Sequence, residues 1–160
     1  MATTEAIPFT RKGYEALKRE LEILKTIERP KVIQEIAEAR AHGDLKENAE
    51  YHAAREKQSF IEGRITILDD SISRANIISF AEENPDTVKF GSYVTVEDEQ
   101  SGEEKTYQIV GDLEADISKN MISMGSPIAK ALMGKRIDDS VEVKVPKGIK
   151  EYVVTNIRYD

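Results

Sequence analysis

Apolar residues in the first half of the chain recur at helical spacing. In the longer series every third or fourth residue is apolar, with a polar exception at Gln58. Its members are Tyr51, Ala54, Gln58, Ile61, Ile65, Leu68, Ile72 and Ala75. The residues between them are mostly charged or polar, and a seam of this kind is typical of a coiled-coil helix. The pattern therefore predicts a helix over about 49–76.

A shorter apolar series precedes this helix and is interrupted by a proline. Its members are Tyr14, Leu17, Leu21 and Leu24. After the proline the pattern continues out of phase, at Ile33, Ile36, Ala37 and Arg40. Pro30 lacks a backbone N–H and fits best in the first turn of a helix. We therefore predict two helical pieces, about 10–28 and 31–42, that lie end to end and antiparallel to the third helix. Such a hairpin is a rod on the order of 40–50 Å long.

The residues that join the two arms favour a short connection. Gly43 suits the left-handed position just past a helix end. Asp44 and Asn48 suit turn and N-cap positions. The tip of the rod is therefore expected near residues 43–48. Asp44 and Glu47 also have the spacing of an N-terminal capping box, which on spacing alone is a sufficient structural role for the pair.

In the second half of the chain the hydrophobic period changes to two. Alternating runs predict five short strands, at about 93–97, 105–110, 120–123, 141–145 and 153–159. Ser126, Pro127 and Gly134 occupy the N-cap, first-turn and C-cap positions of one short helix. This half is expected to be a small, mostly antiparallel sheet with that helix.

A polar linker separates the two patterns within about residues 76–90. We therefore expect a hairpin domain over residues 1–80 and a globular domain over residues 81–160.

Composition excludes several classes of protein. The 160 residues include no cysteine and only two histidines, His42 and His52. Disulfide scaffolds, thiolate zinc sites, cysteine nucleophiles and histidine-rich metal sites are therefore excluded. No apolar run reaches the roughly 20 residues of a membrane helix, and the N-terminus lacks a secretory signal pattern. A cytoplasmic protein with no membrane partner is expected.

The net charge of −7 is unevenly distributed along the chain. Residues 1–80 carry 13 basic and 14 acidic side chains, whereas residues 81–160 carry 10 and 16. Binding to a nucleic-acid backbone depends largely on neutralising phosphates. Any contact of this chain with nucleic acid is therefore expected to be local.

The acidic pair at the tip also suits a metal ion. Mg²⁺ is typically held by one or two protein carboxylates, with waters and phosphate oxygens completing the shell. Asp44 and Glu47 are too few for a tight independent site, but they can help retain an ion that a partner enzyme already coordinates. Arg40 and Arg55 flank the tip, either as ordinary surface arginines or as groups that contact nucleic-acid phosphates.

Two separate motifs resemble those of the bacterial Gre transcript cleavage factors. The run GDLKENAEYHAARE over residues 43–56 is similar to the tip signature of that family. The run NMISMGSPIA over residues 120–129 is similar to its second signature. Residues 7–10 and 107–112 also fit, so the resemblance covers essentially the whole chain.

This resemblance implies an α+β fold, with an N-terminal antiparallel coiled-coil hairpin and a C-terminal FKBP-like antiparallel sheet domain. It implies that the globular domain docks on RNA polymerase and that the coiled coil enters the secondary channel. The tip then stimulates the polymerase's own Mg²⁺-dependent cleavage of backtracked nascent RNA near its 3′ end, so that elongation resumes. The chain itself is expected to be a monomer, not an enzyme, that binds no cofactor in isolation and shares Mg²⁺ with the polymerase.

The resemblance also implies roles for single residues. The shared Mg²⁺ and the attacking water are assigned to Asp44 and Glu47. Support of the tip is assigned to Asn48, Glu50 and Tyr51. Contact with the extruded RNA is assigned to Arg40 and Arg55. Docking on the polymerase is assigned to Ser123, Gly125, Ser126 and Pro127. Gly125 departs from the family pattern, since Asn or Asp is expected there in close relatives.

Two other functions stay open at this point. A modulator of the same shape would occupy the secondary channel without stimulating cleavage. Relatives of that kind have altered tips, whereas Asp44 and Glu47 are intact here. A prolyl isomerase is suggested by the FKBP-like sheet on fold analogy alone. The aromatic-poor second half has no evident aromatic-lined pocket for it.

Overall fold

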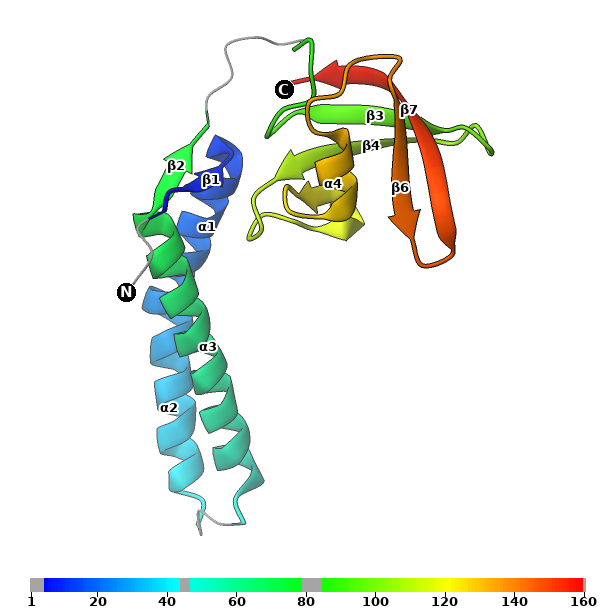
Figure 1. Cartoon of the computed structure of the whole chain (residues 1–160). Coiled ribbons are helices and arrows are strands. Elements are labelled where there is room, and N and C mark those ends of the chain that lie inside the picture. The colour runs from blue at the N-terminus through cyan, green and yellow to red at the C-terminus, as the bar shows by residue number, and fades with distance from the viewer. Residues whose placement is uncertain (1–4, 44–46, 79–84, 160) are drawn as a thin grey trace. The chain divides into compact units, whose positions relative to one another are not determined.

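The computed structural model describes residues 5–43, 47–78 and 85–159 (Figure 1). The chain divides into two compact units, one with residues 1–7 and 12–75 and the other with residues 8–11 and 76–160. The predicted domain boundary at residues 80–81 lies outside the described residues. The predicted α+β class is confirmed, because a helical hairpin comes first and a sheet domain follows.

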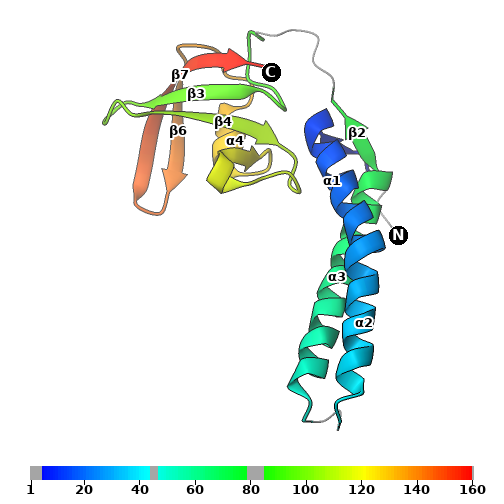
Figure 2. The same cartoon turned by 180° about the vertical axis from the view of Figure 1, so that it is seen from behind.

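The first unit is an antiparallel helical hairpin (Figures 1 and 2). Its first arm consists of α1 (Arg11–Ile23), the π-helical turn η1 (Leu24–Glu28) and α2 (Arg29–Arg40). Its second arm is α3 (Ala49–Ser73). These bounds agree closely with the helices that the sequence predicts.

The structure contains a two-stranded sheet that was not predicted. One of its strands precedes the first arm of the hairpin and the other follows the second arm. Strand β1 (Ile7–Phe9) pairs with β2 (Ala75–Ile77). The third helix therefore ends three residues before the predicted position 76, because residues 75–77 pair as a strand. The heptad pattern does not reveal where the helix changes to a strand, since Ala75 fits both the helical period and the strand period.

The seam of α3 lies where the sequence predicts it. Ala54, Ile61, Ile65 and Leu68 are buried, and Gln58 is half-buried. Val32 of the first arm forms a hydrophobic cluster with Ile61 and Ile65. This cluster fixes the contact between the two arms.

The seam of α2 differs from the predicted one by one residue. Val32 is fully buried, whereas Ile33 is 52% exposed. Ala39 is buried in place of the predicted Ala37 and Arg40. The predicted phase of this helix was therefore wrong.

The π-helical turn accounts for the observed phase. An α-helical continuation of Leu17, Leu21 and Leu24 would put residues 31 and 38 in the seam, and one additional residue moves the seam to Val32 and Ala39. The N–H of Arg29 donates to the carbonyl oxygen of Leu24, five residues back, so the turn contains one more residue than an α-helical turn. Pro30 has no N–H, which already interrupts the normal hydrogen-bond ladder at this point. Ile23 and Glu28 keep right-handed helical backbone angles, so the arm continues through the turn rather than breaking.

Charged side chains join the two arms on both sides of the seam. The ion pairs between the arms among the described residues are Lys25–Asp69 at 3.0 Å, Arg29–Glu62 at 2.7 Å, Lys57–Glu35 at 3.4 Å and Arg64–Glu20 at 2.8 Å. Hydrogen bonding from Arg29 lowers the pKa of the Glu62 carboxyl below its ordinary value. Solvent screens partly exposed pairs of this kind, so they set the register more than the stability.

The second unit contains a five-stranded sheet. Its strands are β3 (Tyr93–Asp98), β4 (Glu104–Val110), β5 (Met121–Ser123), β6 (Ser140–Val145) and β7 (Gly148–Arg158). The spatial order is β5-β4-β3-β7-β6. Strands β4 and β5 pair in parallel and the other neighbours are antiparallel, as expected for a mostly antiparallel sheet.

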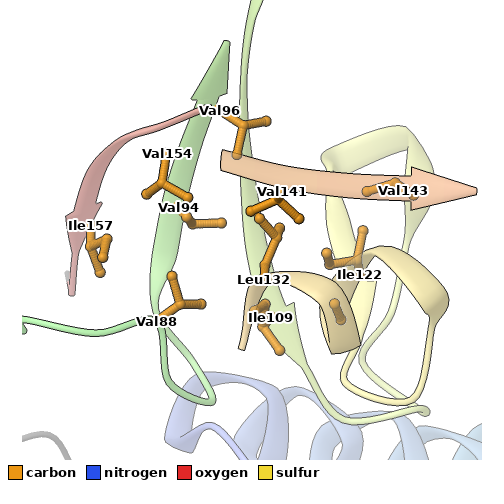
Figure 3. Packing of buried hydrophobic residues seen from close by; sticks show 11 residues of the cluster. Val88, Val94, Val96, Ile109, Ile122, Leu132, Val141, Val143, Val154 and Ile157 are labelled. Atoms are coloured by element: carbon orange, nitrogen blue, oxygen red, sulfur yellow. The ribbon is translucent and has the colours of Figure 1, made fainter. Parts of the chain in front are cut away.

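One face of this sheet packs against α4 (Pro127–Leu132) around a small aliphatic core (Figure 3). Val94, Ile109 and Leu132 are completely buried in it. The predicted N-cap is confirmed, since the Ser126 side chain accepts a hydrogen bond from the Ala129 N–H at 3.3 Å. The C-cap is Met133, one residue before the predicted Gly134. Gly134 follows the last turn with a φ of +82°, which favours glycine.

The phase of α2 can be tested with two neighbouring variants. Val32→Ala should lower the free energy of unfolding of the hairpin by about 2 kcal/mol, because it leaves a cavity at a fully buried position. Ile33→Ala should change it by less than about 0.5 kcal/mol, because the side chain is half in solvent. Urea unfolding followed by far-ultraviolet circular dichroism measures both. Equal losses would contradict the one-residue shift.

Candidate functional site at the hairpin tip

The two arms end close together at the tip of the hairpin (Figure 1). The first arm ends with α2 at Arg40, and the chain is described as far as Gly43, whose φ is +135°. It is described again from Glu47, one residue before the cap of α3. Asp44, the strongest predicted metal ligand, lies outside the described residues.

Asn48 connects both arms with one side chain. Its Oδ1 accepts a hydrogen bond from the Tyr51 N–H at 3.0 Å, which caps α3. Its Nδ2 donates to the carbonyl oxygen of Ala39, in the last turn of α2, at 2.5 Å. The predicted N-cap is therefore confirmed. The bond to the opposite arm has no signal in the sequence, because it depends on how the arms pack.

Glu47 is not part of a capping box. In that motif the acidic residue lies three positions after the N-cap. Here the N-cap is Asn48, so Glu47 precedes it and position N3 is Tyr51. The structural explanation of the Asp44–Glu47 spacing is therefore wrong. Glu47 is exposed and lines an open hollow of about 460 Å³ with His42, Asn48, Ala49 and Glu50.

One flank of the hairpin near the tip is an acidic groove of about 380 Å³. It is lined by Glu35, Glu38, Ala39, His42, Glu50, Ala53, Ala54 and Lys57. The Lys57–Glu35 ion pair lies in this groove. Glu50, predicted to support the tip, belongs to it and also lies in the first turn of α3, where a negative charge is favoured.

The Arg29–Glu62 ion pair lies on the opposite side of the seam. At about 100° per residue, Glu62 is about 140° around α3 from Lys57. Arg29 is about 120° around α2 from Glu35. The two inter-arm pairs Arg29–Glu62 and Lys57–Glu35 therefore mark the two flanks of the hairpin.

The stripe through Arg29 and Glu62 continues to the tip. Arg40 is eleven residues after Arg29, so it lies within about 20° of the same line on α2. Tyr51 and Arg55 precede Glu62 by eleven and seven residues, and both lie within about 20° of its line on α3. Arg40, Tyr51 and Arg55 thus share one flank, which we call the cationic flank.

Specific contacts organise the α3 side of the cationic flank. The Tyr51 hydroxyl accepts a hydrogen bond from Arg55 Nη1 at 3.4 Å. The ring of His52 meets the ring of Tyr51 edge to face, with centroids 5.6 Å apart and planes at 66°. Arg40, His52 and Arg55 are exposed, and Tyr51 is half-buried. The two predicted arginines are therefore accessible from solvent.

The second predicted site lies in the loop between β5 and α4. Ser123 Oγ donates to Asp112 and accepts from the Gly125 N–H at 3.2 Å. Ser126 is used as the cap of α4, whereas Gly125 and Pro127 are exposed. The serine hydroxyls thus hold the loop, and its exposed surface lies at Gly125 and Pro127. The contact between Ser123 and Asp112 has no signal in local spacing, because the two residues lie eleven positions apart.

Two further features of the described residues bear on function. They contain no group of three or more His, Cys, Asp or Glu side chains arranged to hold a metal ion. A helix long and apolar enough to cross a membrane is also absent from this part of the chain. Asp44 and Glu47 as shared metal ligands therefore stay a prediction.

A helical hairpin that presents a charged tip, followed by a sheet domain with one short α-helix, defines a class of two-domain hairpin factors. Residues 7–77 match the family model described as transcription elongation factor, N-terminal. Residues 82–159 match the model described as transcription elongation factor, GreA/GreB, C-term. The chain belongs to the GreA/GreB family of transcription elongation factors, which confirms the resemblance seen in its motifs.

Relatives align with this chain over nearly its whole length. Transcription elongation factor GreA of Rhodospirillum rubrum is 57% identical over 155 residues, covering 97% of this chain and 99% of the relative. Transcription elongation factor GreA of Pelobacter propionicus is 54% identical over 157 residues, covering 98% and 99%. The solved structure of the transcription factor Gfh1 is 33% identical, with a TM-score of 0.47, covering 98% and 99%. The names of the two GreA relatives are consistent with a factor rather than an enzyme.

The double role of Asn48 can be separated by substitution. Asn48→Asp keeps the oxygen that caps α3 but removes the donor to Ala39. Asn48→Ala removes both contacts and should destabilise the start of α3 by about 1 kcal/mol. Amide hydrogen exchange should therefore show that the Tyr51 N–H stays protected in Asn48→Asp and loses protection in Asn48→Ala. Equal exchange of this amide in both variants would exclude the capping contact.

Proposed function

We propose that this chain binds RNA polymerase and stimulates cleavage of backtracked nascent RNA from within the secondary channel. The observation that carries the proposal is the position of Glu47, an exposed carboxylate ahead of the N-cap that has no capping role. Membership of the elongation factor family supports it. The proposal makes the chain an activator of the polymerase's own activity, working in the bacterial cytoplasm as a monomer.

The proposed chemistry uses Asp44 and Glu47 as oxygen donors. A Mg²⁺ ion shared with the polymerase and the RNA phosphate supplies Lewis-acid activation of water when it is bound. Carboxylates suit this hard ion, and two of them complete a shell that a partner already fills in part. Within this chain, Asn48 and Tyr51 hold the start of α3, so that Glu47 leaves the helix at a defined point.

The cationic flank is assigned to the extruded RNA. Arg40 and Arg55 are exposed on the same side of the hairpin, one on each arm. Guanidinium groups bind phosphate oxygens through paired hydrogen bonds. The proposal places the RNA backbone along this flank rather than along the acidic groove, where Glu35, Glu38 and Glu50 would repel it.

Docking on the polymerase is assigned to the loop that contains Ser123, Gly125, Ser126 and Pro127. The hydrogen bonds of Ser123 and the cap at Ser126 make this loop rigid. A preformed loop loses little conformational entropy on binding. Gly125 and Pro127 offer the exposed surface for the contact.

The tip carboxylates are tested with a stalled, backtracked elongation complex that carries 3′-labelled RNA. Asp44→Ala and Glu47→Ala should each slow the release of short labelled fragments about 10- to 100-fold, because an ion loses one of its ligands. Binding to the polymerase, measured by competition, should stay unchanged. Gel analysis of the fragments over time gives the rates.

Glu56→Ala is the matched control for these variants. It removes the same charge from an exposed position further along α3, and should leave cleavage within about twofold of the unmodified protein. If the unmodified protein binds and no fragment is released, the chain modulates the polymerase without cleavage, and the proposal is overturned.

The docking loop is tested with Gly125→Arg. A Cβ at this position would lie 3.8 Å from Ser123 Oγ and 3.9 Å from Asp112 Oδ1, so the loop accommodates a side chain. The variant should fold normally and bind polymerase at least about 10-fold more weakly, because a bulky cation occupies the contact surface. Gln100→Arg adds the same charge to the exposed β3–β4 turn and should bind normally. Equal affinities of the two variants would exclude the loop from the interface.

A further inference from the structure

The cationic flank carries aromatic rings beside its guanidinium groups. His52 is exposed and borders Tyr51, whose hydroxyl is bonded to Arg55. We call Tyr51, His52 and Arg55 the aromatic platform. Contact with phosphate alone needs cations and makes no use of rings. The platform therefore contains aromatic rings that the binding of backbone phosphates alone does not require.

The three members of the platform differ in how firmly they are held. Tyr51 is half-buried, its N–H is bonded to Asn48 and its hydroxyl to Arg55. Its ring is therefore fixed and supports the other two side chains. His52 and Arg55 are exposed, and both present planar groups to solvent on the first two turns of α3.

Planar groups next to cations are the chemistry that binds single-stranded nucleic acid. Bases stack on aromatic rings and on guanidinium planes, while the backbone phosphates meet basic side chains. Arg40 lies on the same flank as the platform but on the other arm. The surface therefore combines planar groups for a base with a cation for a phosphate.

We propose that the aromatic platform binds a nucleobase of single-stranded RNA, with the base stacked on His52 and Arg55 and a neighbouring phosphate near Arg40. This deepens the proposed function and takes its biological setting from it, since the ligand there is the extruded 3′ segment. The planar shape of the base then contributes to RNA binding, in addition to the charge of the phosphate.

The two flanks provide an internal control. Both histidines of the chain lie near the tip, but His42 lines the acidic groove and His52 belongs to the platform. A ligand that binds the platform changes the environment of His52 and leaves that of His42 unchanged. A ligand that collects around the tip without a site affects both.

The experiment is a nuclear magnetic resonance titration of the isolated full-length protein, followed at the two histidine imidazoles. A uridine tetranucleotide should shift the His52 signals in a saturable way and leave the His42 signals in place. An abasic oligomer with the same number of phosphates should shift His52 much less. Equal effects of the two oligomers, equal shifts of both histidines, or no shift at millimolar oligonucleotide would each overturn the proposal.

Two variants on α3 separate stacking from general electrostatics. Arg55→Ala should weaken binding of the tetranucleotide about 5-fold or more, because it removes a stacking plane and a cation. Lys57→Ala removes the same charge from the acidic groove and should change the affinity by less than twofold. Equal weakening by both variants would contradict the platform. Neither result depends on cleavage, so a failure here leaves the roles proposed for Asp44 and Glu47 to be tested separately.

Discussion

The phase of the first arm against α3 determines which side chains reach each flank of the tip. Val32 and Ala39 meet the second arm only because the π-helical turn contains one additional residue. One residue corresponds to about 100° of rotation. If the arm ran as an uninterrupted α-helix in phase with Leu17, Leu21 and Leu24, residues 31 and 38 would face α3, and Arg40 would lie on the outer face of the arm, about 180° from the seam. The position of this arginine on the cationic flank thus follows from a backbone irregularity far from the tip.

The tip itself is fixed by polar contacts rather than by burial. Beyond Ala54 the seam of α3 has only half-buried Tyr51, so little apolar surface holds the last turn. Asn48 compensates with one hydrogen bond along α3 and one to the opposite arm. Both arms therefore end in register, and Glu47 starts from a defined point although its own carboxylate is exposed.

Much of this fold is predictable from the sequence, because it depends on local periodicity. The seam from Ala54 to Leu68, the five strands of the second unit, and the caps at Asn48 and Ser126 all follow from short-range rules. The phase of Val32, the bond from Asn48 to Ala39 and the parallel pairing of β5 depend instead on long-range packing. No spacing rule contains that information. The capping-box interpretation of Glu47 failed for a local reason, since the sequence offers both Asp44 and Asn48 as N-caps and the structure uses Asn48.

An acidic tip and the proposed RNA-binding flank are compatible on one hairpin because of distance and screening. The acidic groove and the cationic flank lie on opposite sides of the seam, about one helix diameter of 10–12 Å apart. At physiological ionic strength the screening length is about 8 Å. Glu38 and Glu50 therefore act weakly on a phosphate that lies beside Arg40 and Arg55. In the proposed function, the segregation of charge lets one surface accept an anion while the tip between the flanks offers carboxylates to a cation.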